Sequence, residues 1–169
     1  MQHWLQTGER DLSRERIETE RCIITPFSFD TGVAMEELTQ EFCKANKDLF
    51  VSPFLPTLPE EIEFVTKVVN AIMNGETFEN FILEKETRAL IGCIGLNNPE
   101  ENRMNIGLWI RESEHGKGYA TETYRALLSW ARDNTRYQYL KHSLDPRNDA
   151  SRKLALKFSG ILQPETNEK

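Results

Sequence analysis

Residues 107–121 carry the pattern with the clearest chemical consequence. An alternating apolar run ends there, and small residues follow at Gly116, Gly118 and Ala120 before a helical pattern begins. Glycines let a ligand approach the main chain closely, and the first N–H groups of a helix have no intrahelical partner. The segment therefore predicts a site for a phosphate or pyrophosphate group, helped by the positive end of the helix dipole.

Two common phosphate motifs fit this segment poorly. A Walker A loop ending at Gly116 and Lys117 needs Ser or Thr at the next position and Gly five residues earlier, where the chain has Gly118 and Arg111. A dinucleotide fingerprint that starts at Gly116 has Thr121 in its third glycine position. The first motif is excluded, and the second is weak.

Residues 115–120, His-Gly-Lys-Gly-Tyr-Ala, resemble the acyl-CoA loop of the GNAT superfamily of N-acetyltransferases. That loop reads Arg or Gln, two residues, Gly, one residue, then Gly or Ala, and His115 replaces the usual first residue. Residues 19–27, 105–110 and 145–153 are similar to the branch that contains the ribosomal-protein alanine N-acetyltransferases. The resemblance implies a cofactor site formed by Trp109, Ile110, His115, Gly116, Lys117, Gly118, Tyr119, Ala120, Thr121, Asn148 and Ser151.

The resemblance also implies the reaction. A neutral primary amine would attack the thioester of acetyl-CoA directly, with no acyl-enzyme. Main-chain groups of Trp109 and Ile110 would bind the pantetheine arm and the oxyanion, although the Trp109 side chain equally fits core packing. Asn148 would bind the cofactor arm and also fits a helix N-cap, and both roles are compatible. Ser151 would protonate the leaving thiolate; the alternative is local bonding to the backbone.

The general base is the open part of this mechanism. Many relatives have Glu where this chain has Asn105, and an amide does not accept the proton of an amine. We expect Asn105 to favour an acceptor of low pKa, such as a protein amino terminus, over polyamine or lysine amines. Glu84, Glu112 and Glu114 are candidate bases that also fit ordinary surface positions.

The periodicity predicts one α/β domain over residues 19–169 after a lead-in, 1–18, that is loose or a short helix. The expected strands are 20–29, 77–84, 88–97, 103–111 and 138–144. The expected helices start at Asp30, at Pro59, after Gly118 and at Asn148, and the last one runs to about Phe158. This order implies the GNAT fold, a mixed, mostly antiparallel sheet with a splayed centre and about four helices.

The carboxyl end departs from the family pattern. Residues 163–169 leave room for at most one short strand where relatives have two, so the final strand is expected to be missing or shortened. An exposed sheet edge, pairing of two copies as a homodimer, and impaired catalysis all follow from such a loss. The alternative function is therefore a non-catalytic acetyl-CoA-binding module or degenerate relative.

The charge and residue composition indicate which kinds of partner the protein has. The net charge is −6, yet residues 111–160 hold ten Lys/Arg against six Asp/Glu, which suits an anionic cofactor beside a cationic acceptor and disfavours nucleic acid. The three cysteines and three histidines are scattered, so we expect no metal site and no disulfide framework. No membrane-length apolar run or leader pattern is present, and we expect a cytoplasmic protein whose partners are acetyl-CoA and a primary amine.

Overall fold

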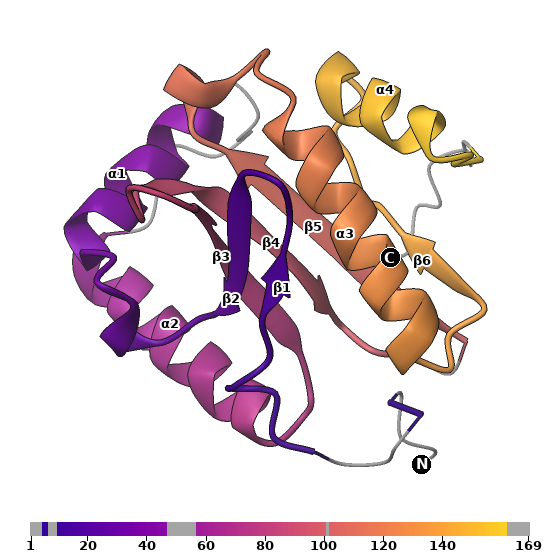
Figure 1. The fold of residues 1–169 in the computed structure, drawn as a ribbon, viewed down its shortest axis with the longest axis horizontal. Helices are drawn as coiled ribbons and strands as arrows, with labels where there is room; N and C mark the ends of the chain where they lie inside the picture. Colours follow the sequence, from indigo (N-terminus) through magenta and orange to yellow (C-terminus); the bar gives the residue numbers. More distant parts are fainter. Residues whose placement is uncertain (1–4, 7–9, 47–56, 101, 162–169) are drawn as a thin grey trace.

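A computed structural model describes residues 5–6, 10–46, 57–100 and 102–161, and within them the chain forms one six-stranded sheet (Figure 1). The strands lie in the order of the sequence, and each is antiparallel to its neighbour except for the parallel pair β5–β6. The strands are β1 (Ile17–Glu18), β2 (Cys22–Pro26), β3 (Phe78–Glu84), β4 (Leu90–Asn97), β5 (Arg103–Ile110) and β6 (Tyr139–Lys141).

Helices cover both faces of this sheet. The α-helices of the described residues are α1 (Met35–Asn46), α2 (Leu58–Met73), α3 (Tyr119–Asn134) and α4 (Asp149–Lys157). Trp109 of β5 meets Phe42 of α1 edge-on, with ring centroids 5.7 Å apart, whereas Phe78 of β3 stacks on Trp130 of α3 at 4.2 Å. The α1 and α2 helices therefore lie on one face, α3 lies on the other, and α4 lies beside the first turns of α3 (Figure 1).

The sheet opens between β5 and β6. Their parallel pairing covers only Arg103, Met104 and Asn105, which face Tyr139, Leu140 and Lys141. β5 then continues to Ile110, whereas the chain after β6 runs away from it toward α4 (Figure 1). The splayed centre expected from the sequence is present at this fork, where one edge of β5 is left without a strand partner among the described residues.

The residues before Thr19 do not form the expected loose lead-in where the structure describes them. Leu5 and Leu12 are buried in the core, and Ile17–Glu18 pairs with β2. Leu5 also forms an isolated bridge with Thr135, directly after α3. This packing is hard to predict, because two isolated leucines in an Arg/Glu-rich stretch have no periodicity.

Several element boundaries differ from expectation: the strand expected over 20–29 is limited to Cys22–Pro26, and the one expected over 88–97 begins at Leu90. The helix predicted from Asp30 begins only at Met35, because a 3₁₀ turn (Phe29–Thr31) capped by Ser28 comes first and Gly32 then adopts a left-handed φ of 82°. The strand predicted over 138–144 ends at Lys141, where the fork opens. The antiparallel strands β3, β4 and β5 and the capped helix α4 are confirmed.

Within the described part of the chain, no group of three or more His, Cys, Asp or Glu side chains could hold a metal ion. None of its helices is both long and apolar enough to cross a membrane. Cys22 and Cys93 are buried and Cys43 is half-buried, and all three are free thiols.

Candidate functional site

The glycine loop leads directly into the first turn of α3. Gly116 and Gly118 both have left-handed φ angles, 75° and 87°, and a β-carbon at Gly116 would meet no atom within 4 Å. Gly118 caps the helix without a side chain, and its carbonyl accepts the Glu122 N–H at 3.1 Å. The N–H groups of the three preceding helix positions, Tyr119 to Thr121, are therefore those that a helix leaves without intrahelical partners. They face an open surface suited to an anion.

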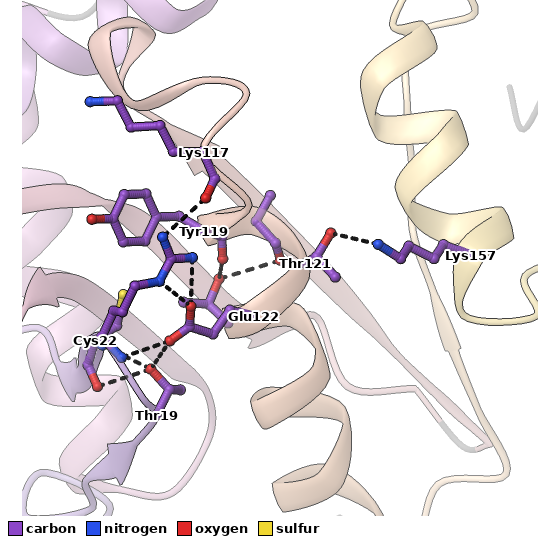
Figure 2. Close-up of polar contacts among 10 residues, drawn as sticks. Thr19, Cys22, Lys117, Tyr119, Thr121, Glu122 and Lys157 are labelled. Atoms are coloured by element: carbon purple, nitrogen blue, oxygen red, sulfur yellow. Dashed lines mark hydrogen bonds and ion pairs between the residues drawn. The ribbon is translucent and has the colours of Figure 1, made fainter.

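An arginine that was not predicted from the sequence contacts this loop from the turn directly before β2. The Arg21 guanidinium donates to the Lys117 carbonyl at 3.0 Å and lies 4.2 Å from the centre of the Tyr119 ring. Its Nη2 pairs with Glu122 Oε2 at 2.7 Å. Glu122 also accepts from the Thr19 hydroxyl at 2.6 Å (Figure 2), and its pKa is lowered because these hydrogen bonds and the Arg21 charge outweigh its burial.

This Arg21–Glu122 clamp joins residues 101 positions apart in the sequence. It joins the first turn of α3 to the residue just before β2, and this contact stabilises the loop that precedes α3. Arg21 lies in a segment that resembles the family, Glu122 follows directly after the predicted cofactor residues, and no local spacing links one to the other.

The open edge of β5 ends at the same loop. The Arg111 N–H donates to the Ile91 carbonyl at 2.9 Å, and bonded pairs alternate along an antiparallel ladder. The main-chain groups of Ile106, Leu108 and Ile110 therefore point away from β4, toward the fork. His115 Nε2 lies 2.7 Å from the Ile110 carbonyl oxygen and donates to it in the matching tautomer, so His115 ties the loop to the end of β5.

The far side of the fork is formed by α4. The Asn148 side chain accepts the Ser151 N–H at 3.0 Å, so the expected N-cap is present. Lys157 near the end of α4 lies 3.5 Å from the Thr121 hydroxyl in the first turn of α3 (Figure 2). The fork thus has the main-chain groups of Leu108 and Ile110 on one side, the glycine loop at its open end, and Asn148 and Ser151 on the other side. Trp109, which the resemblance places at the cofactor, instead has its main chain paired with β4 and its side chain on the opposite face of the sheet.

The other predicted side chains have local roles in the structure. Lys117 pairs with Glu114 at 2.9 Å, and Glu84 accepts from the Thr87 hydroxyl at 2.5 Å, which lowers the Glu84 pKa. Asn105 stands at the last β5–β6 pair, and its buried Oδ1 makes no hydrogen bond in the described structure. Because Glu84 and Glu114 are bonded to these neighbours, neither carboxylate points to the fork.

A buried tyrosine on α3 adds a second hydroxyl that the sequence reading did not consider. Tyr124 Oη lies 3.2 Å from His142 Nδ1, just after β6, and the Tyr124 ring also contacts Phe158 at 5.2 Å between centroids. Burial raises the pKa of Tyr124 to about 12 and lowers that of His142. The hydroxyl is therefore protonated and the imidazole neutral near pH 7.

The opposite face of β5 borders a separate cavity of 440 Å³, between the sheet and the helices α1 and α2. Its apolar lining includes Phe42, Phe64 and Trp109, and its carboxylates are Glu60, Glu61 and Glu79. An aromatic pocket with carboxylates suits an organic cation such as a protonated amine. β5 therefore separates the glycine loop on one face from an acidic cavity on the other.

Comparison with known proteins gives the family. The acetyltransferase (GNAT) domain matches residues 26–159, so the chain belongs to this family. The uncharacterized N-acetyltransferase p20 of Bacillus licheniformis is 24% identical over 113 residues, which cover 66% of this chain and 63% of that protein. The match thus spans less than two thirds of that relative.

Solved structures show the same fold. An acetyltransferase from Agrobacterium tumefaciens superposes with a TM-score of 0.70 and 24% identity over 91% of this chain and 88% of that one. RimL, a ribosomal L7/L12 alpha-N-protein acetyltransferase in complex with coenzyme A, gives a TM-score of 0.70 and 20% identity over 85% and 82% of the two chains. The expected α/β fold, with a mostly antiparallel, splayed sheet, is confirmed.

Proposed function

We propose that this protein transfers the acetyl group of acetyl-CoA directly to a primary amine, namely the α-amine of a protein or peptide. The observation that carries the proposal is the fork itself. It joins an open edge of β5 to a glycine loop at the N-terminus of α3, and an acidic cavity lies on the opposite face. The pyrophosphate fits the loop, the pantetheine arm fits the β5 edge, and the amine fits the cavity.

The pKa values of amines indicate which class of acceptor fits this site. An α-amino group has a pKa near ~8, so about a tenth is neutral at pH 7, whereas deprotonating a lysine-type amine of pKa ~10.4 costs roughly 4 to 5 kcal/mol. Asn105 supplies no base at the position where relatives carry Glu. An α-amine is therefore the acceptor that this site deprotonates most readily, in keeping with the RimL likeness.

The test is a panel of amines incubated with acetyl-CoA while free thiol is followed. We expect an Ala-initiated peptide to accelerate thiol release far more than spermidine at pH 7. Comparable turnover of both would remove the α-amine preference. Thermal stabilisation by acetyl-CoA without any turnover would favour the alternative, a non-catalytic acetyl-CoA-binding module. Absence of both effects would reject the cofactor assignment.

A further inference from the structure

The cavity between the sheet and α1–α2 contains a carboxylate that the reaction described above does not use. Glu79 of β3, Gly95 of β4 and Gly107 of β5 face one another in a single cross-strand row. Residues in such a row point to the same face of a sheet. Trp109 lies two residues from Gly107, so this row shares its face with Trp109 and opens toward the cavity.

Gly95 makes room for the Glu79 side chain. A β-carbon at Gly95 would come within 3.0 Å of the Glu79 carboxylate, so the carboxylate lies directly over the main chain of β4. Glu79 Oε1 accepts from Asn97 Nδ2 at 2.5 Å, which holds the side chain there. The carboxylate is therefore one strand away from β5, whose far edge forms the fork.

The space over Gly107 is open. Asn97 Nδ2 would be the nearest atom to a β-carbon at Gly107, at 3.9 Å, and no other atom would be close. An amine that enters the cavity could occupy this space. It would then lie between the Glu79 carboxylate and the strand whose opposite edge we assign to the thioester.

We propose that Glu79 is the general base for the acceptor, binding the incoming ammonium over Gly107 and taking its proton. This inference rests on the proposed acetyl transfer. The proton moves from the ammonium to the Glu79 carboxylate, and the neutral amine attacks the thioester carbonyl as a C–N bond forms and the C–S bond breaks. The second amine proton leaves with the thiolate as free thiol, and Glu79 returns its proton to solvent.

The surroundings of Glu79 favour this proton transfer. Burial raises the pKa of Glu79, more than the Asn97 hydrogen bond lowers it. Desolvation penalises an ammonium and a carboxylate together, and proton transfer between them removes both charges. The other titratable groups that line the described cavity are Glu60 and Glu61 on α2 and Cys93 on β4. Burial raises the pKa of Glu61 and Cys93, whereas Glu60 is held ionised by the Thr57 N–H and hydroxyl.

The first test is Glu79→Gln, which keeps the shape and the Asn97 contact but removes the base. With saturating acetyl-CoA and an Ala-initiated peptide, we expect kcat/KM at pH 7 to fall about 100-fold or more. The gap should narrow as pH rises toward 9.5, because more of the peptide then arrives as neutral amine. Stabilisation by acetyl-CoA should be unchanged. Glu63→Gln is the matched control, since Glu63 is exposed on α2 and pairs with Lys67 at 2.6 Å.

Three outcomes would overturn the proposal in distinguishable ways. Wild-type kcat/KM at pH 7 in Glu79→Gln would reject the base while leaving acetyl transfer intact. An equal loss with the same pH profile in Glu61→Gln would mean that Glu79 acts only through the charge of the cavity. If no amine releases thiol with the wild-type protein although acetyl-CoA stabilises it, the transfer itself is wrong and the base is rejected with it.

A second variant tests the position of the amine without touching Glu79. Gly107→Ala places a methyl group in the open space over β5, and this strand position has no positive φ to oppose alanine. We expect KM for the peptide to rise about tenfold or more, with acetyl-CoA stabilisation unchanged. An unchanged KM would show that the amine does not lie over Gly107.

Discussion

The two faces of β5 differ in how far apart in the sequence their residues lie. On one face, the glycine loop, the start of α3 and the β5 end lie within residues 103–121, so the proposed anion site is assembled from neighbours in the sequence. On the other face, the cavity takes its walls from α1, α2, β3, β4 and β5. A site made of main-chain groups needs only one local backbone conformation. A pocket lined by side chains needs the strands to pair in the correct register and the helices to pack correctly against them.

The charges of the two faces differ as well. The loop face has Arg21, Lys117 and Lys157 around the helix N-terminus, each near a carboxylate or a hydroxyl. The cavity face has Glu60, Glu61 and Glu79, and no Lys, Arg or His among the described residues that line it. Opposite fields on two sides of one strand suit two substrates of opposite charge that meet at that strand. The predictions below test each face separately.

The largest expected effect is on the loop face. Gly118→Glu places bulk and negative charge against the proposed pyrophosphate, so we expect acetyl-CoA affinity to fall at least about 100-fold and thermal stabilisation to vanish. Gly118→Ala is the control, because it has the same left-handed backbone strain, about 1–2 kcal/mol, without the charge. Unchanged stabilisation of Gly118→Glu by acetyl-CoA would show that the cofactor does not use this loop.

The next effect concerns chemistry at the fork. Ser151→Ala should lower kcat by about 10- to 100-fold, because the leaving thiolate loses its proton donor, while acetyl-CoA stabilisation persists. Steady-state kinetics at saturating acetyl-CoA measures this. Tyr124→Phe is the rival variant, since its protonated hydroxyl lies near His142. A larger loss in Tyr124→Phe than in Ser151→Ala would move the donor from α4 to α3.

A smaller effect is expected from the support behind the loop. Arg21→Gln removes the ion pair with Glu122, and we expect acetyl-CoA affinity to fall about tenfold as the loop loses its brace. Titration calorimetry measures this change. Arg16→Gln, an exposed residue whose side-chain bonds stay within residues 13–16, is the matched control. Equal affinities of the wild-type protein and Arg21→Gln would mean that the loop holds its shape unaided.

The smallest effect is a pH dependence on the cavity face. Burial raises the Glu79 pKa above its ordinary 4.5, so above that pH the folded state holds more protons than the unfolded state. The contribution of Glu79 to stability is therefore fully present below pH 4.5 and is lost as pH rises through the folded-state pKa. Glu79→Gln escapes this loss, so its Tm relative to wild type should rise between pH 4.5 and pH 8. A Tm difference independent of pH would contradict the raised pKa, and Glu63→Gln should show none.

Much of the fold could be read from the sequence, because its signals are local. The alternation in β3 to β5, the cap at Asn148 and the glycines that open α3 each depend on residues a few positions apart. The start of α1 and the end of β6 were misjudged, since both depend on where the chain turns away from the sheet. The buried Leu12 was missed for a similar reason, because its partners are distant.

The sequence by itself therefore determined the order of the elements, the glycine loop that opens α3 and the family resemblance. The tertiary structure alone decided what surrounds them. Glu122 meets Arg21 across 101 residues, and Glu79 lies over Gly95 only because β3 and β4 pair in this register. Spacing along the chain fixes main-chain conformation, whereas register and face fix which distant side chains meet. The base proposed for the acceptor belongs to that second kind of information.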